Sequence, residues 1–252
     1  MAYTLLKASS KKIFLPYLVN PNMNFVATSI ENEEIAESMT LAALRHALND
    51  ALLQSMEWFQ SSEELRKASN ALRSSHFCYM AGKCLTKLSP GLGRLRHISF
   101  NDKDVKRQPG EWLLDAVVAE CDADEFGAAG MVSKIHVAME CESSTAMKEF
   151  ATDFSKLLHV KAEKKIYLQG LNQRHEPSAR AFMAQRLQLA SRYIQKIDPD
   201  PTWYFGFWPS PLALKIKADD RSLWANMNNG SNGHLNGVKL YKFNGQEFTD
   251  KD

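Results

Sequence analysis

The chain has 252 residues, with 31 Lys and Arg against 29 Asp and Glu, a formal net charge of +2, and 44% hydrophobic residues. This balanced composition is typical of a packed globular protein and excludes a disordered or fibrous chain. No stretch approaches the roughly 20 apolar residues that cross a bilayer. The first residues lack the core and cleavage site of a signal peptide. We therefore expect a cytoplasmic protein with no membrane partner.

Helical periodicity marks the first part of the chain. Leucines at 41, 44, 48 and 52 recur at spacings of three and four, which predicts an amphipathic helix over residues 32–59. Ser61 or Ser62 can cap a second helix over residues 61–84, with Glu63 and Glu64 in its first turn. Two further helices are predicted over residues 145–161 and 177–197, the second opened by Pro177.

Three strands are predicted between these helices, over residues 94–100, 111–120 and 134–142, and their short connectors favour an antiparallel meander. A strand at 164–169 follows a helical crossover, so it should run parallel to the third strand. Strands at 202–208 and 238–243 complete the chain. The fold class is therefore α/β (α+β), with core order α-β-β-β-α-β and a central mixed sheet of about four to six strands flanked by helices.

We expect residues 1–252 to form a single domain in three parts. An N-terminal segment and helix take residues 1–60, the core takes residues 61–170, and the C-terminal helix and strands take residues 171–252. A flexible loop rich in Asn and Gly is predicted at residues 226–237.

Four cysteines, at positions 78, 84, 121 and 141, show no Cys-x-x-Cys spacing and no nearby histidine cluster. A zinc site or a disulfide framework is therefore not indicated, and reduced, mostly buried thiols are expected.

Carboxylates on two of the predicted strands suggest a metal site. Alternate residues of a strand share one face, so Glu140 and Glu142 lie together at the end of the strand 134–142. Asp115 lies among apolar residues, where an ionised carboxylate is costly unless something pairs with it. If the strands are neighbours, the three acids converge and a divalent cation can neutralise them. Oxygen ligands suit Mg²⁺ or Mn²⁺ better than zinc. The alternative is that Glu140 and Glu142 are solvated residues on an open sheet face.

A family resemblance lies in three segments, GEWLLDAVVAE, KIHVAMECESS and DFSKLLHVKAEKKIYLQ. They resemble the PD-(D/E)XK nuclease superfamily, also called restriction-endonuclease-like, whose core has the order α-β-β-β-α-β. In that family an acid on the second core strand matches Asp115, and an acid-x-Lys element on the third matches Glu140 and Glu142. Glu142 stands where Lys is usual, although some similar restriction-type nucleases carry Glu-x-Glu. The resemblance covers roughly residues 63–170 and implies Mg²⁺-dependent cleavage of DNA.

Lys156 is the candidate to replace the missing lysine, since some family members supply the cation from the following helix. At about 100° per residue, however, Lys156 falls nearly opposite the apolar stripe of its helix, which favours a solvated lysine. Asp153 is a similar case, expected at the surface or in packing. Glu63 and Glu64 are candidates for a further metal ligand, with helix capping as the simpler interpretation.

Other residues have a functional and a structural interpretation. His136 shares the face of Glu140 and could relay a proton, but a partly solvated histidine is the commoner arrangement. Two basic clusters, Lys103, Lys106, Arg107 and Lys161, Lys164, Lys165, could attract nucleic-acid phosphates or simply be solvated. Five aromatic residues lie at positions 203, 204, 205, 207 and 208, where closing a core or a subunit interface is favoured over stacking on bases.

The first hypothesis is a Mg²⁺- or Mn²⁺-dependent endonuclease that acts on DNA, with a role in restriction, repair or phage defence. Asp115 and Glu140 would hold the metal, and Glu142 would bind it or position the attacking water, with Lys156 as the cation. The second hypothesis is a non-catalytic nucleic-acid- or protein-binding module that keeps a nuclease-like fold. Either is compatible with a homodimer.

Overall fold

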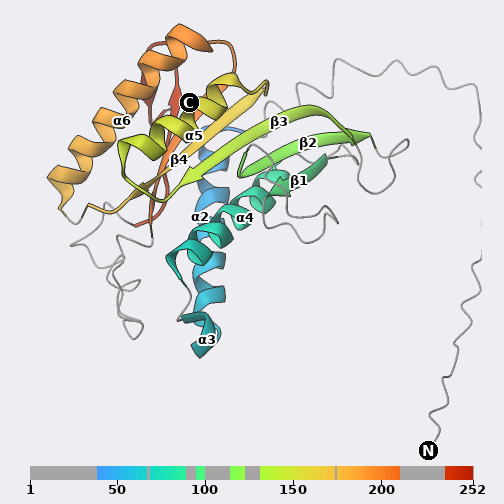
Figure 1. The fold of residues 1–252 in the computed structure, drawn as a ribbon, viewed down its shortest axis with the longest axis vertical. Coiled ribbons are helices and arrows are strands. Elements are labelled where there is room, and N and C mark those ends of the chain that lie inside the picture. The colour runs from blue at the N-terminus through green and yellow to red at the C-terminus, as the bar shows by residue number, and fades with distance from the viewer. Residues whose placement is uncertain are drawn as a thin grey trace, which may run out of the picture.

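Seven strands form one mixed sheet at the centre of the protein (Figure 1). The computed structural model describes residues 39–66, 69–88, 95–99, 114–122, 131–173, 175–210 and 236–251. The helices in these ranges are α2 (Leu41–Gln60), α3 (Glu63–Arg66), α4 (Asn70–Lys87), α5 (Met147–His159) and α6 (Glu176–Ile197). The strands are β1 (Leu95–Ser99), β2 (Ala116–Asp122), β3 (Met131–Glu142), β4 (Lys164–Leu171), β5 (Thr202–Pro209), β6 (Lys239–Phe243) and β7 (Phe248–Thr249).

The strands lie side by side in chain order, from β1 at one edge to β7 at the other. Strands β1, β2 and β3 pair antiparallel, whereas β3, β4 and β5 pair parallel. Helix α5 makes the crossover from β3 to β4 that parallel pairing requires. The predicted mixed sheet, the antiparallel meander and the order α-β-β-β-α-β from α4 to β4 are confirmed. The sheet has seven strands rather than about four to six, because the two-residue β7 adds one strand beyond the predicted β6.

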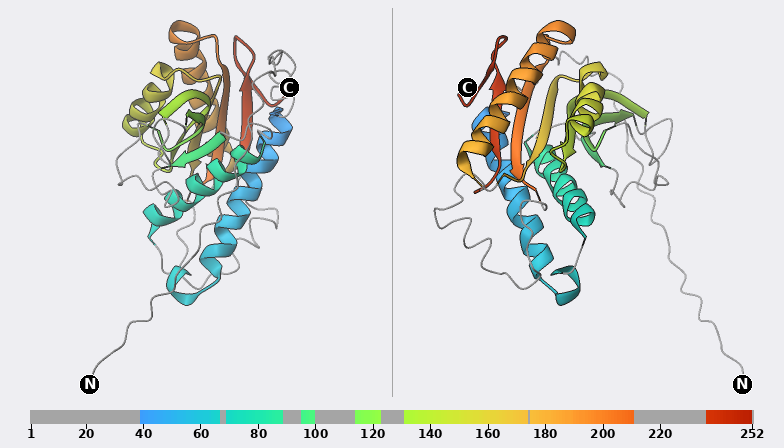
Figure 2. Two further views of the ribbon diagram at one scale, coloured as in Figure 1. Left: turned by 90° about the vertical axis from the view of Figure 1, so that its right-hand side faces the viewer. Right: turned by 60° about the vertical axis from the view of Figure 1, so that its left-hand side comes forward.

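Helices cover both faces of the sheet, as Figure 2 shows. Helices α5 and α6 pack on the face that carries Ala138 and Tyr167. Helices α2 and α4 pack on the face that carries Met139 and Ile166. Neighbouring residues of β3 and of β4 therefore enter different cores, as the period of two in a strand requires.

The aromatic run of β5 serves both cores. Trp203, Phe205 and Phe207 are buried on the α5 and α6 side, and Tyr204 and Trp208 on the other. The prediction that these residues close a core is confirmed.

Hydroxyl caps set where the N-terminal helices begin. Helix α2 begins at Leu41 because the Thr40 hydroxyl accepts a hydrogen bond from the Ala43 N–H at 3.1 Å. The helix was predicted to start near residue 32, but residues 39 and 40 are not helical, so that start is wrong. Residues 32–38 lie outside the described part of the chain. Where one helix over 61–84 was predicted, α3 and α4 are separate. The Ser69 hydroxyl accepts from the Leu72 N–H at 3.2 Å and caps α4 anew.

Strand β2 starts later than the predicted residue 111. Strand β2 begins at Ala116, so Asp115 immediately precedes it. The first basic cluster and positions 226–235 of the predicted Asn/Gly-rich loop lie outside the described residues.

Candidate functional site

Asp115 and Glu140 meet across the junction of β2 and β3. In the antiparallel register Val117 pairs with Ala138 and Ala116 pairs with Met139, so the next position brings Asp115 beside Glu140. The Asp115 Oδ2 accepts a hydrogen bond from the Cys141 N–H at 2.8 Å. The two carboxyl groups are also hydrogen-bonded to each other. The predicted convergence of these two acids is therefore present in the structure.

Glu140 is the more deeply buried of the pair, with 1% of its surface exposed. Burial, and then the charge of Asp115, raise the pKa of Glu140 to about 9. Burial also raises the pKa of Asp115, while the hydrogen bond from the Cys141 N–H opposes that rise. Glu140 therefore carries a proton at neutral pH and donates it to Asp115. The Oε1 atom of Glu140 is buried and has no hydrogen-bond partner among the described residues.

Lys156 reaches this pair from α5. Its Nζ atom lies 2.8 Å from Asp153 Oδ1 and 3.5 Å from Glu140 Oε1. The longer distance is too long for a strong hydrogen bond, so Glu140 Oε1 has a charged neighbour but no hydrogen-bond donor in the described residues. Burial alone would lower the pKa of Lys156, but the hydrogen bond with Asp153 and the charge of Glu140 reverse this effect and raise it.

Lys156, expected to be solvated, is in contact with Glu140 of the sheet, and Asp153, expected at the surface or in packing, is its ion-pair partner. The Lys156 side chain is 32% exposed and that of Asp153 is 17% exposed, and both face the acids of the sheet. A helical wheel places only the Cβ atom, whereas the long aliphatic stem of lysine can carry its ammonium group around the helix flank. The ammonium group of Lys156 therefore lies beside the acids, although the helical wheel placed it on the solvent side.

Glu142 is the last residue of β3, just before the segment that leads into α5. Its Oε1 atom accepts a hydrogen bond from the Ser144 N–H at 2.5 Å, and its carboxyl group is hydrogen-bonded with Asp153. Burial is the main cause that raises the pKa of Glu142. The five charged side chains therefore form a chain of contacts in the order Asp115, Glu140, Lys156, Asp153, Glu142. We call this group the acidic site.

Strand β4 contributes two polar residues that the sequence analysis did not identify. Tyr167 pairs with Glu140 and Gln169 pairs with Glu142 in the parallel register, so each lies on the face of the acids. Both residues are 0% exposed. Gln169 Nε2 donates to the Ser144 carbonyl at 2.5 Å, while Gln169 Oε1 and the Tyr167 hydroxyl have no hydrogen-bond partner in the described residues. The available signal was a glutamine among the apolar residues of the second half of the strand.

Gly170 lets β4 approach Ser143, the residue that follows Glu142. A Cβ atom at Gly170 would collide with the backbone of Ser143, which is rigid and cannot yield as a flexible side chain would. Only glycine therefore allows β4 to pass this close to the segment leading into α5.

The acidic site offers two adjacent carboxyl groups to the predicted Mg²⁺. Within the described ranges, no group of three or more His, Cys, Asp and Glu residues has the arrangement of a metal site. Mg²⁺ is commonly held by one or two carboxylates and keeps several waters, so the pair of Asp115 and Glu140 has a suitable donor set. The Glu140 Oε1 atom is buried and accepts no hydrogen bond in the described residues, and its nearest charged neighbour is Lys156 Nζ at 3.5 Å. The residues fit a cation held by two carboxylates.

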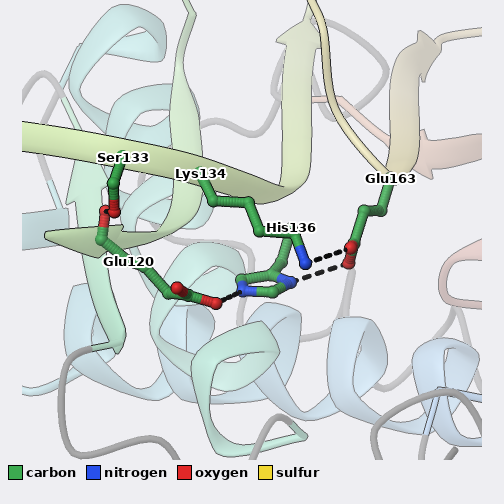
Figure 3. Close-up of polar contacts among 5 residues, drawn as sticks. All are labelled: Glu120, Ser133, Lys134, His136 and Glu163. Carbon is green, nitrogen blue, oxygen red and sulfur yellow. Dashed lines mark hydrogen bonds and ion pairs between the residues drawn. The ribbon is translucent and has the colours of Figure 1, made fainter. Parts of the chain in front are cut away.

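His136 belongs to a different cluster, drawn in Figure 3. It is 4% exposed, and its two ring nitrogens lie 2.5 Å from Glu120 Oε1 and 2.7 Å from Glu163 Oε2. Lys134 Nζ lies 2.6 Å from the other oxygen of Glu163. Both ring nitrogens are engaged, so the His136 side chain links β2 and β3 to the residue that precedes β4. The expectation of a partly solvated histidine is wrong.

The second basic cluster is not a uniform phosphate-facing surface. Lys165 is 1% exposed, its Nζ lies 2.5 Å from Asp198 Oδ2, and it lies over the Trp203 ring at 5.0 Å. Lys165 is therefore a buried structural cation, and the interpretation as a phosphate contact or solvated charge is wrong for it. Lys161 is exposed and Lys164 is half-buried.

Glu63 and Glu64 cannot supply a ligand to the acidic site. They are exposed in the first turn of the four-residue helix α3, at the end of α2 and α4 that points away from the sheet (Figure 1). The simpler interpretation, that these charges favour the start of a helix, is supported.

The cysteines behave as reduced thiols where the structure describes them. Cys78, Cys84 and Cys141 are free, and the first two are buried. Cys78 of α4 is hydrogen-bonded to Cys141 across the sheet face opposite the acids.

No helix in the described residues is both long and apolar enough to cross a membrane. Comparisons of the chain with protein-family models, with curated proteins and with solved structures gave no match.

Proposed function

We propose that this protein is a divalent-metal-dependent phosphodiesterase that cleaves DNA, built on a restriction-endonuclease-like core. The observation that carries the proposal is the buried contact between Asp115 and Glu140, with one Glu140 oxygen left without a hydrogen-bond partner in the described residues. Two carboxyl groups in contact inside a protein need either a shared proton or a cation. The element order around them supports the same proposal.

The charges of the acidic site favour a cation of charge two. Four carboxylates and one ammonium group carry a net charge of −3 when all are ionised, and a divalent cation reduces this to −1. Lys156 alone cannot balance Glu140, because it also binds Asp153 and lies 3.5 Å from Glu140 Oε1. A buried charge that stays unbalanced is costly, so cation binding and loss of the Glu140 proton should occur together.

The proposed roles follow from the positions of the side chains. Asp115 and Glu140 hold the cation through their carboxylate oxygens. A bound Mg²⁺ or Mn²⁺ supplies an acidic water and charge stabilisation on a phosphoryl oxygen. Lys156, one-third exposed at the edge of the site, places a positive charge where a substrate phosphate can reach it. Glu142, fixed by the Ser144 N–H, orients the attacking water.

The test is cleavage of supercoiled plasmid DNA by the purified chain with Mg²⁺, Mn²⁺ or EDTA. The wild-type chain should nick or linearise the plasmid only with a divalent cation, and Asp115→Asn and Glu140→Gln should lose this activity. Glu57→Gln, an exposed acid of α2 outside the acidic site, is the matched control and should cleave as the wild type does. DNA binding without cleavage under any of these conditions would instead support the non-catalytic module.

A further inference from the structure

Tyr167 is a buried hydroxyl group that the proposed roles do not use. It lies on β4 in register with Glu140 and is 0% exposed. Its hydroxyl group has no hydrogen-bond partner among the residues that the structure describes. A buried hydroxyl without a partner loses its contacts with water and regains nothing, so a purely structural role would favour phenylalanine at this position.

The aromatic ring of Tyr167 is held in one orientation. The Phe150 and Phe154 rings of α5 meet it edge-on, with centroids at 5.5 and 5.4 Å, and the Phe205 ring of β5 packs at 5.1 Å. Phe154 directly follows Asp153 on α5, so the helix that fixes the ring also carries that acid. The hydroxyl group is thus preorganised rather than free to seek a partner.

The carboxylates of the acidic site act electrostatically on the Tyr167 hydroxyl group. After burial, Asp153 and then Glu142 contribute most to raising the pKa of Tyr167. The raised pKa means that the phenol keeps its proton and remains a donor. A neutral donor facing carboxylates stabilises them when they are ionised.

Arg186 is a charged neighbour of Tyr167 that cannot accept its proton. This arginine of α6 is 3% exposed and lies over the Phe150 ring at 5.0 Å, and it interacts electrostatically with Tyr167. Its Nη2 atom donates to the Thr145 carbonyl, whereas its Nε–H has no partner in the described ranges. Because a guanidinium group can only donate hydrogen bonds, Arg186 offers no acceptor for the Tyr167 proton, whereas an ionised carboxylate does.

We propose that Tyr167 is a positioning residue of the acidic site, whose hydroxyl group donates a hydrogen bond to Asp153 when a divalent cation occupies Asp115 and Glu140. This inference rests on the proposed function. When the divalent cation binds Glu140, Asp153 becomes the one carboxylate partner of Lys156 among the described residues. The Tyr167 hydroxyl group then holds the Asp153 carboxylate in place by a hydrogen bond. Because this hydrogen bond forms only when the divalent cation is bound, its free energy adds to the free energy of cation binding.

The test compares two tyrosines that differ in the state of their hydroxyl groups. Tyr167→Phe removes the unpartnered hydroxyl. Tyr204→Phe is the matched control on the opposite face of the sheet, where the Tyr204 hydroxyl donates to the Met39 carbonyl at 3.3 Å. Each variant is titrated with Mn²⁺ by calorimetry and melted without metal. Tyr167→Phe should weaken Mn²⁺ binding roughly tenfold, as expected for a lost hydrogen bond to a charged group, with an unchanged metal-free melting temperature. Tyr204→Phe should bind Mn²⁺ normally and melt earlier.

Two results overturn the inference while the proposed function stands. One is wild-type affinity for Mn²⁺ in Tyr167→Phe. The other is a metal-free melting temperature that falls in Tyr167→Phe as much as in Tyr204→Phe, which would make the hydroxyl structural. A wild-type chain that binds no Mn²⁺ contradicts the proposed function and this inference together.

Discussion

The carboxyl group of Glu140 on β3 is hydrogen-bonded to that of Asp115, the residue just before β2, inside a protein interior that leaves Glu140 1% exposed. Two antiparallel strands create this contact, because their register sets the acids side by side. Because the pair is buried, two negative charges there would repel each other, so the pair needs either a shared proton or a bound cation. The predictions below follow from that dependence and from the residues around the pair.

Glu140→Gln should leave the metal-free protein as stable as the wild type at pH 7. Glutamine has the shape of the protonated glutamic acid that the raised pKa implies, and it can still donate to Asp115. Melting by differential scanning calorimetry in EDTA should show a shift of no more than about 2 °C. A large loss of stability would mean that Glu140 is ionised in the folded chain.

Stability of the metal-free protein should fall as the pH rises, and Glu140 should be one cause. The pKa of Glu140 is about 9 in the folded chain, against an ordinary value of 4.5. Between these values the folded chain binds the extra proton, so unfolding becomes more favourable as the pH increases. The contribution has a limit of about 1.4 kcal/mol per pH unit. Asp115 and Glu142, whose pKa values are also raised, act in the same direction.

This contribution can be isolated by comparing the wild type with Glu140→Gln in urea unfolding from pH 5.5 to 8.5. The loss of stability with pH should be shallower in the variant. Parallel curves for the two proteins would contradict the protonated Glu140.

Lys156→Met should reduce DNA cleavage about 100-fold and leave the fold intact, since positive charge at a phosphoryl transition state is commonly worth that factor. Its side chain is 32% exposed, so the loss of packing is small. Lys156→Arg should recover part of the activity. Lys196→Met, an exposed lysine in the last turn of α6, is the control and should cleave normally. Full activity in Lys156→Met would remove this lysine from the mechanism.

His136→Gln should destabilise the protein by about 2 to 3 kcal/mol. Losing one partner of a buried ion pair costs about 3 to 5 kcal/mol, and this cluster should cost less because the Glu163 side chain is 42% exposed. Urea unfolding measures the loss. Metal-dependent cleavage by the folded fraction should persist, because His136 binds Glu120 and Glu163 and makes no contact with the acidic site in the described residues. Loss of cleavage in folded His136→Gln would show that the two clusters are coupled.

The sheet and the position of its acids could be predicted because they depend on local alternation. Period-two alternation assigned Glu140 to the face opposite Met139, and the apolar surroundings of Asp115 singled it out. The positions of Lys156 and His136 could not be predicted the same way. The reach of a lysine stem and the approach of Glu163 to His136 depend on how elements far apart in the chain pack together. Likewise, the separate cap at Ser69 overrode a helical pattern that continues through it.

The most direct test of the central claim is Mn²⁺ binding by the metal-free chain, measured by isothermal titration calorimetry beside Asp115→Asn. We predict binding to the wild type with release of a proton from Glu140, detected as a heat that depends on the ionisation enthalpy of the buffer. Asp115→Asn should remain folded and lose this binding. A wild-type chain that binds no Mn²⁺, or an Asp115→Asn chain that binds it equally well, would contradict a cation site formed by Asp115 and Glu140.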